Sequence, residues 1–394
     1  MNRGYKRTLC ASYIGYITQA IVNNLAPLLF VIFQREFEIS VAKIGLLVTY
    51  NFCVQITVDF IAAKYAERIG YKKCIVAAHI FSVAGLVGLG LFPSLLPDSY
   101  AGLLLAITVY AIGGGLIEVL VSPIVEALPL DEKSGEMSLL HSFYCWGHAI
   151  VVILTTVFFY FAGTENWRFV TAIWAVIPAA NAVLFATSPI LTYSAGEEEV
   201  PMRKLFRMKI FWIFVLLMLC AGASEQAMSQ WASYFAEQGL GVSKTLGDLL
   251  GPCMFALLMG TSRALYGAFS SKVSLQRVLV YSGALCIFSY LIAVFSPIPL
   301  LSLIGCGICG LSVGVLWPGT FSLSAEKYPQ GGTTMFALLA LAGDLGCGGG
   351  PSTVGFVSEL TDGRLQSGLF VAIVFPLMLI FGIRLLTKKS WVKT

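Results

Sequence analysis

The chain is built from apolar runs, each of them long enough to cross a lipid bilayer as a helix. About twenty apolar residues span the hydrocarbon layer. Only 12% of the residues are charged, against about 25% in soluble domains. The runs number about twelve, at residues 9–33, 43–63, 74–93, 99–127, 137–162, 167–188, 210–236, 245–270, 275–296, 299–323, 333–358 and 365–386. The sequence therefore predicts an all-α membrane protein with twelve transmembrane helices and no separate water-soluble domain.

The Lys and Arg residues are distributed unevenly between the two sets of predicted loops. Cytoplasmic loops of membrane proteins carry an excess of these residues. With the N-terminus in the cytoplasm, nineteen Lys and Arg fall on inside segments and five on outside segments. We therefore expect a multi-pass protein of the cell membrane, plasma or inner, with both termini cytoplasmic. The first run is too long for a signal peptide, so we interpret it as the first span.

One long polar segment, residues 191–209, divides the chain into two sets of six spans, at residues 1–190 and 210–394. The two sets share a repeat at an offset of about 200 residues. AAKYAERIGYKKCIV from Ala62 aligns with YGAFSSKVSLQRVLV from Tyr266, and GGLIEVLVSPIVEALP from Gly114 aligns with GVLWPGTFSLSAEKYP from Gly314. Parallel six-helix halves related by an axis along the membrane normal are typical of major facilitator transporters. The repeat therefore predicts two pseudo-symmetric six-helix halves joined by a cytoplasmic linker.

The loop between the second and third spans resembles the signature of the major facilitator family, G-x-L-x-D-R-x-G-R-K. The loop reads DFIAAKYAERIGYKK, in which the first glycine of the pattern is replaced by alanine. The remaining positions are matched by Glu67, Arg68, Gly70, Lys72 and Lys73. The resemblance implies that this loop clamps two helix ends by charge and releases them when the transporter changes state. Asp59 and Arg263 occupy equivalent places near the cytoplasmic ends of spans two and eight, so we expect gating roles for Asp59, Glu67, Arg68 and Arg263.

In span four, Glu118 is followed by Ser122 and Pro123, and span five contains the segment LHSFYCWG. These segments resemble a narrower group, the fucose-permease branch of sugar:proton symporters, which carries Glu-x-x-x-Asn-Pro at the same spacing in span four. It also carries L-H-x-F-[FY]-G-x-G in span five, where this chain reads LHSFYCWG. The acid that the group places in span one is replaced by Asn23 or Asn24. The resemblance implies a sugar-like solute and proton coupling through Glu118.

Glu118 is a carboxyl group in the middle of an apolar span. Ionisable residues in such places face a water-filled cavity or a partner, and they mark ion or substrate pathways. Ser122 lies one turn further on the same face, and Pro123 frees a backbone carbonyl close to Glu118. We predict that Glu118 carries the coupled proton; the alternative is an acid that only hydrogen-bonds to a neighbouring helix. Glu225 and Asp344 are further candidate coupling acids.

Span seven carries a polar stripe with an aromatic flank in the segment SEQAMSQW. The repeat relates Glu225 and Gln226 to Asn23 and Asn24 of span one, and the family resemblance implies that these spans face each other across a central cavity. Amides bond hydroxyl groups both as donors and as acceptors, and an indole packs against the C–H surface of a sugar ring. The stripes therefore predict a site for a neutral polyol or sugar, with interhelical hydrogen bonding as the alternative.

Further polar and aromatic residues complete the predicted solute site. His141, Tyr144 and His148 share one face of span five at i, i+3 and i+7, where they could line a cavity or extend a proton path. No third ligand converges on the two histidines, so we predict no metal. The predicted substrate-binding residues are Gln19, Asn23, Asn24, Ser122, His141, Tyr144, His148, Gln226, Gln230, Trp231 and Trp317.

The glycine runs and the cysteines are predicted to pack helices. GGG at Gly113 and GCGGGP at Gly346 follow no strand and carry no P-loop lysine, so they are not phosphate sites. Small residues of this kind let membrane helices approach closely. The ten cysteines are scattered through apolar runs without the spacing of metal ligands.

These features predict a secondary active transporter that moves a small polar, sugar-like solute by alternating access in symport with a proton, with sodium as the other possible coupling ion. An exporter or antiporter of amphipathic compounds is the alternative, although the drug-antiporter motif G-x-x-x-G-P-x-x-G is missing from the span-five segment GHAIVVILTT. No nucleophile–base pair stands out, so we expect neither enzyme activity nor a cofactor. The expected partners are the solute, the coupling ion and the lipid bilayer, without nucleic acid, and the chain is expected to be a monomer.

Overall fold

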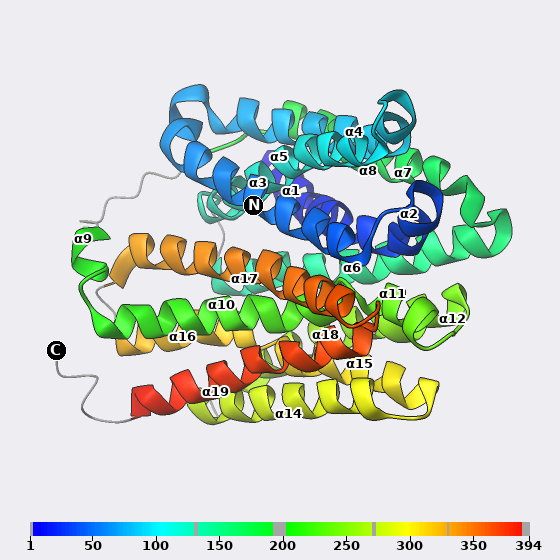
Figure 1. Ribbon diagram of the computed structural model, residues 1–394. Coiled ribbons are helices and arrows are strands. Elements are labelled where there is room, and N and C mark those ends of the chain that lie inside the picture. The colour runs from blue at the N-terminus through cyan, green and yellow to red at the C-terminus, as the bar shows by residue number, and fades with distance from the viewer. Residues whose placement is uncertain (1–2, 130–132, 192–201, 270–272, 329–330, 388–394) are drawn as a thin grey trace. The chain divides into compact units, whose positions relative to one another are not determined.

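The computed structural model describes residues 3–129, 133–191, 202–269, 273–328 and 331–387 (Figure 1). Within these residues the chain forms helices and short connections and no strand, which confirms the predicted all-α class. Residues 192–201 of the predicted linker and the side chain of Glu67 lie outside the described part of the chain.

The helical segments agree closely with the predicted spans. The N-terminal segments are α1 (Arg3–Asn24), η1 (Ala26–Leu29), α2 (Phe30–Phe37), α3 (Val41–Ile69), α4 (Tyr71–Leu95), α5 (Ser99–Glu126), α6 (Lys133–Ala162), η2 (Thr164–Asn166), α7 (Trp167–Trp174) and α8 (Val176–Thr187). The C-terminal segments are α9 (Met202–Leu205), α10 (Lys209–Ser229), α11 (Ala232–Tyr234), η3 (Phe235–Gly239), α12 (Lys244–Asp248), η4 (Leu249–Cys253), α13 (Met254–Phe269), α14 (Leu275–Phe295), α15 (Pro299–Val313), α16 (Leu316–Lys327), α17 (Gly332–Leu360), α18 (Leu365–Ala372) and α19 (Val374–Thr387).

In the described residues, eleven helical stretches are long and apolar enough to cross a membrane. Each of them coincides with a predicted span; the fourth, for example, runs from Ser99 to Glu126 against a predicted 99–127. The remaining predicted span, 333–358, coincides with α17, a helix of 29 residues that is not among those eleven. The chain is a multi-pass membrane protein.

Prolines explain where several spans are interrupted. A proline lacks the N–H of a helical hydrogen bond and crowds the carbonyl four residues earlier. Accordingly α7 ends at Trp174, four residues before Pro178, and α18 ends at Ala372, four residues before Pro376. By contrast, α5 continues through Pro123 to Glu126. Span four is therefore an uninterrupted helix at the position of Glu118.

The chain divides into two compact units. Unit 1 comprises residues 1–39 and 50–195, and unit 2 comprises residues 40–49 and 196–394. The boundary at 195–196 falls within the polar segment that we predicted to join the two halves, whereas the first residues of α3 group with unit 2. Each unit has its own helical core.

In unit 1, α4 and α5 pack at backbone distance through glycine. A Cβ atom at Gly85 would lie 2.3 Å from the backbone nitrogen of Tyr110. A Cβ atom at Gly113 would lie 2.5 Å from the carbonyl oxygen of Ala78. Because any larger residue would collide with backbone atoms, the predicted packing role of the first glycine run is confirmed.

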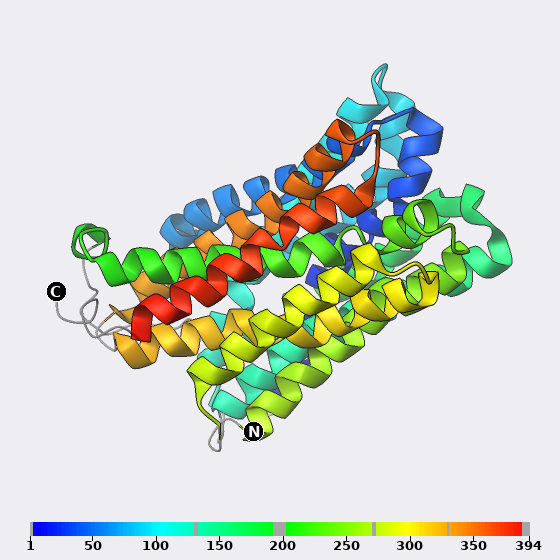
Figure 2. The ribbon, with the colours of Figure 1, turned by 60° about the horizontal axis from the view of Figure 1, so that its bottom comes forward.

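In unit 2, α10 and α17 lie side by side and approach equally closely (Figure 1). A Cβ atom at Gly346 would lie 2.0 Å from the carbonyl oxygen of Leu219, and one at Gly350 would lie 2.6 Å from that of Ala223. The second glycine run therefore also serves helix packing. The neighbouring yellow helices α14 and α15 run side by side as well (Figure 2).

Candidate functional site

A chain of side-chain amides joins α1, α3 and α5 in unit 1. Gln19 Nε2 donates hydrogen bonds to Glu118 Oε2 at 3.0 Å and to Gln55 Oε1 at 3.2 Å. Gln55 Nε2 and Asn51 Nδ2 both donate to Asn23 Oδ1, at 2.8 and 3.2 Å. All four amide side chains are buried. Two predicted site residues of span one are thereby connected to the predicted coupling acid, Glu118.

Asp59 continues the polar face of α3 by one more turn. Asn51, Gln55 and Asp59 follow one another at intervals of four residues, so they share a helix face. The Asp59 carboxyl is close enough to Glu118 for the two groups to interact electrostatically. The residue that we predicted as a gating charge therefore lies beside the predicted coupling acid.

Hydroxyl and imidazole groups from α5 and α6 meet α1 on either side of Gln19. Tyr16 OH and Ser122 Oγ are 3.1 Å apart and share a hydrogen bond. The His141 ring meets the Tyr16 ring edge-on, with centroids 5.0 Å apart. Asn24 Nδ2 donates to Tyr144 OH at 3.3 Å. Four of the predicted substrate-binding residues therefore lie around one polar region of α1, namely Asn24, Ser122, His141 and Tyr144.

The remaining predicted residues of unit 1 differ in exposure. Of the three residues expected on one face of span five, His141 is exposed, Tyr144 is half-buried and His148 is buried. Arg68 is exposed at the end of α3. The three α6 side chains therefore differ in solvent exposure, although they were predicted to share one helix face.

In unit 2, the predicted stripe of span seven forms a second connected network. Gln230 Nε2 donates to Gln226 Oε1 at 2.9 Å, and Gln226 Nε2 donates to Glu225 Oε1 at 3.2 Å. Arg263 Nη2 lies 3.6 Å from Glu225 Oε2, and Arg263 Nε donates to the carbonyl oxygen of Gly314 at 3.2 Å. The stripe therefore ends in an ion pair between α10 and α13. Glu225 is therefore a partner of Arg263.

The two tryptophans of the predicted solute site make packing contacts in unit 2. Trp231 is fully buried, and its indole N–H donates to the carbonyl oxygen of Pro351 at 3.0 Å. Trp317 packs against α17, since a Cβ atom at Gly343 would lie 2.2 Å from its ring. Asp344 follows Gly343 on α17 and is buried. Both indoles therefore contact α17.

The two networks occupy corresponding places in the sequence repeat. A Cβ atom at Gly115 would lie 3.1 Å from Asp59 Oδ1, which brings the acid of span two against span four. In unit 2, Arg263 of span eight donates to Gly314 of span ten. Each unit therefore places a charged residue of its second span against a glycine of its fourth span, with opposite sign in the two units.

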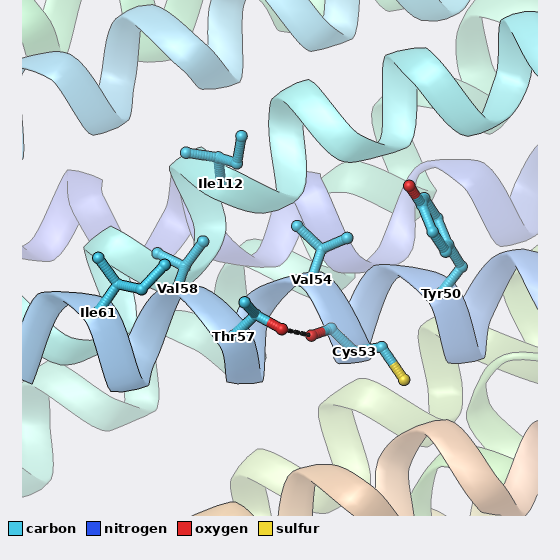
Figure 3. Close-up of a pocket in the computed structure, with 7 residues that line it drawn as sticks. All are labelled: Tyr50, Cys53, Val54, Thr57, Val58, Ile61 and Ile112. Atoms are coloured by element: carbon cyan, nitrogen blue, oxygen red, sulfur yellow. Dashed lines mark hydrogen bonds between the residues drawn. The ribbon is translucent and has the colours of Figure 1, made fainter.

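The other face of α3 carries a shallow apolar groove of about 380 Å³. Figure 3 shows Tyr50, Cys53, Val54, Thr57, Val58 and Ile61 of α3 and Ile112 of α5 lining it. The hydroxyl of Thr57 is already bonded to the carbonyl oxygen of Cys53 at 2.8 Å. The groove contains none of the polar residues described above, so it is separate from the candidate site.

Sequence reasoning missed three members of the unit 1 network, Asn51, Gln55 and Tyr16. The first two carry a signal, because polar residues four apart in an otherwise apolar span mark one helix face. Tyr16 carries no comparable signal, because a tyrosine in a span is equally typical of packing.

The fold and the buried polar networks are those of a polytopic membrane transporter. The family model of the Major Facilitator Superfamily matches residues 11–351, and the chain belongs to that family, whose members are transporters. None of the curated proteins matches the sequence.

Solved structures of this family share the fold over nearly the whole chain. A bacterial homologue of the human lysosomal transporter Spinster covers 98% of this chain and 96% of its own, with a TM-score of 0.76 and 16% identity. A D-xylose–proton symporter covers 98% and 96%, with a TM-score of 0.75 and 14% identity. The E. coli fucose:proton symporter covers 98% and 100%, with a TM-score of 0.66 and 17% identity.

Proposed function

We propose that this transporter moves a small, neutral, sugar-like solute in symport with a proton. The observation that carries the proposal is the amide network of unit 1 that ends on the Glu118 carboxyl. An amide can give up a hydrogen bond to another amide and form one to a solute hydroxyl group, because each amide both donates and accepts. A site of this kind favours polyhydroxy compounds over purely apolar ones.

Glu118 is the proposed proton carrier. It is the acid that the network contacts directly, through a single donor on Gln19. If Gln19 moved its donated hydrogen bond from Glu118 to a solute hydroxyl, solute binding would be linked to the charge of the Glu118 carboxyl. Glu225 and Asp344 are the proposed secondary acids; the ion pair of Glu225 with Arg263 supports a role in changing state rather than in carrying the proton.

The similarity to D-xylose and fucose symporters supports a sugar-like solute, and the span-four and span-five patterns support the fucose-permease branch. We further propose that residues 1–190 and 210–394 are the two functional halves, that both termini face the cytoplasm of a cell membrane, and that the single chain is the transport unit. The nineteen-to-five distribution of Lys and Arg supports that orientation.

Uptake by reconstituted vesicles tests the proposal. The purified chain is reconstituted and given radiolabelled D-glucose, D-xylose and L-fucose, with and without an imposed inward proton gradient. We expect accumulation of at least one sugar that requires the gradient. Efflux of the lipophilic dye ethidium without any sugar uptake would instead favour an exporter of amphipathic compounds.

A further inference from the structure

Two buried acceptor oxygens in unit 1, Gln19 Oε1 and Asp59 Oδ1, have no hydrogen-bond donor among the described residues. The amide orientation of Gln19 is set by its neighbours. Its Nε2 donates to two oxygens, Gln55 Oε1 and Glu118 Oε2, and Gln55 is itself held because its Nε2 donates to Asn23. Turning the Gln19 amide over would place an acceptor against two acceptors. The Oε1 atom is therefore held on the side without a donor, although Gln19 is only 3% exposed.

Two consecutive glycines of α5 bring these oxygens to the same helix. A Cβ atom at Gly114 would lie 3.2 Å from Gln19 Oε1, and a Cβ atom at Gly115 would lie 3.1 Å from Asp59 Oδ1. Glu118 follows three and four residues later, on the adjoining turn. Because these glycines carry no side chains, α5 presents only its backbone to the amide oxygen and to the Asp59 carboxyl at these two positions.

The two carboxyl groups meet no counter-charge among the described residues. Neither Asp59 nor Glu118 forms an ion pair within the part of the chain that the structure describes. Two neighbouring carboxylates in a low-dielectric region repel each other, and burying them without a counter-charge is costly. A ligand that supplies positive charge and needs no donor would satisfy both carboxylates and the unpaired amide oxygen.

We propose that Asp59, Glu118 and Gln19 Oε1 form a binding site for a monovalent hard cation, Na⁺. Carboxylate and carbonyl oxygens are the ligands that hard cations take. In the described residues no three His, Cys, Asp or Glu side chains converge to hold a metal ion, so a transition metal lacks its usual ligands here. A proton on Glu118 removes one ligand charge, so protonation and Na⁺ binding compete. Use of the site for coupling rests on the proposed transport function, whereas occupancy by Na⁺ does not.

Thermal unfolding of the full-length purified chain without solute tests occupancy. We compare NaCl with choline chloride at constant ionic strength and pH. We expect the melting temperature to rise saturably with Na⁺ and not with choline, because a ligand that binds the folded state stabilises it. An equal response to both salts would overturn the proposal and would leave the sugar-uptake test unaffected.

Three variants locate the effect. Asp59→Asn should abolish the Na⁺-dependent shift, and Gln19→Leu should weaken Na⁺ binding at least tenfold. The matched control is Asp98→Asn, since Asp98 caps the start of α5 through the backbone N–H of Tyr100 and asparagine caps equally well. Equilibrium binding of ²²Na⁺ reports on any variant whose melting temperature changes for other reasons. Retention of wild-type ²²Na⁺ binding by Asp59→Asn would contradict the assignment.

Discussion

Gln19 Nε2 donates a 3.0 Å hydrogen bond to Glu118 Oε2, joining two residues that are 99 positions apart in the chain. The bond connects span one, which lacks the acid of the fucose-permease branch, to the acid of span four. An amide can therefore substitute for a second acid as the immediate neighbour of Glu118. The second carboxyl near Glu118 comes instead from span two, at Asp59.

The end of α2 offers a stability prediction at Glu36. Its carboxyl accepts from the indole N–H of the fully buried Trp167 at 2.8 Å and pairs with Arg168. Glu36→Ala should cost about 1–3 kcal/mol, because the indole N–H loses its acceptor. Glu36→Gln keeps an acceptor and loses only a partly exposed ion pair, so it should cost at most about 1 kcal/mol. Melting temperatures of the two variants give the order, and equal losses would contradict this account.

The glycine-rich α17 provides a matched pair. A Cβ atom at Gly346 would lie 2.0 Å from the carbonyl oxygen of Leu219, whereas one at Gly349 would meet nothing within 4 Å. Gly346→Ala should therefore separate α10 from α17 and destabilise unit 2 by about 1–3 kcal/mol or more. Gly349→Ala should be neutral or slightly stabilising, because alanine favours a helix. Melting temperature and monodispersity after detergent extraction measure both; a harmless Gly346→Ala would show that the two helices do not pack this closely.

The ion pair between Glu225 and Arg263 predicts a rescue. Their nearest atoms are 3.6 Å apart, and the Glu225 side chain is 9% exposed. Arg263→Met should cost about 3–5 kcal/mol, because it leaves a buried carboxylate without its counter-charge. The double variant with Glu225→Gln should recover much of that loss, since neither charge remains. A double variant as unstable as Arg263→Met alone would show that the arginine acts through other contacts.

The spans were predictable because length and hydropathy alone decide whether a segment can cross a membrane. The packing role of the glycine runs was also predictable, because only glycine lets two helices approach as closely as α17 and α10 do at Gly346 and Leu219. The spacing of the polar residues predicted the stripe of span seven. It did not predict that the stripe ends in an ion pair with Arg263.

The contacts between helices were not predictable, because they depend on how each helix is rotated about its axis. Nothing in the sequence indicates that Asp59 turns toward Glu118 rather than toward the loop that follows α3. Trp231 illustrates a second limit. The sequence does not indicate that α10 ends at Ser229, two residues earlier, or that the indole N–H donates to the carbonyl oxygen of Pro351. The residue at which a helix is interrupted determines the direction of the side chains that follow it.

The central claim is that Glu118 carries the coupled proton, and Glu118→Gln tests it most directly. Glutamine keeps an oxygen that can accept the Gln19 bond but cannot release a proton. Vesicles are given the labelled sugar of highest uptake and an inward gradient of about one pH unit, which supports up to about tenfold accumulation per proton. We predict that the wild type and the control Glu126→Gln accumulate the sugar, whereas Glu118→Gln only equilibrates it and still exchanges it with preloaded sugar. Gradient-driven accumulation by Glu118→Gln at the wild-type level would contradict the claim.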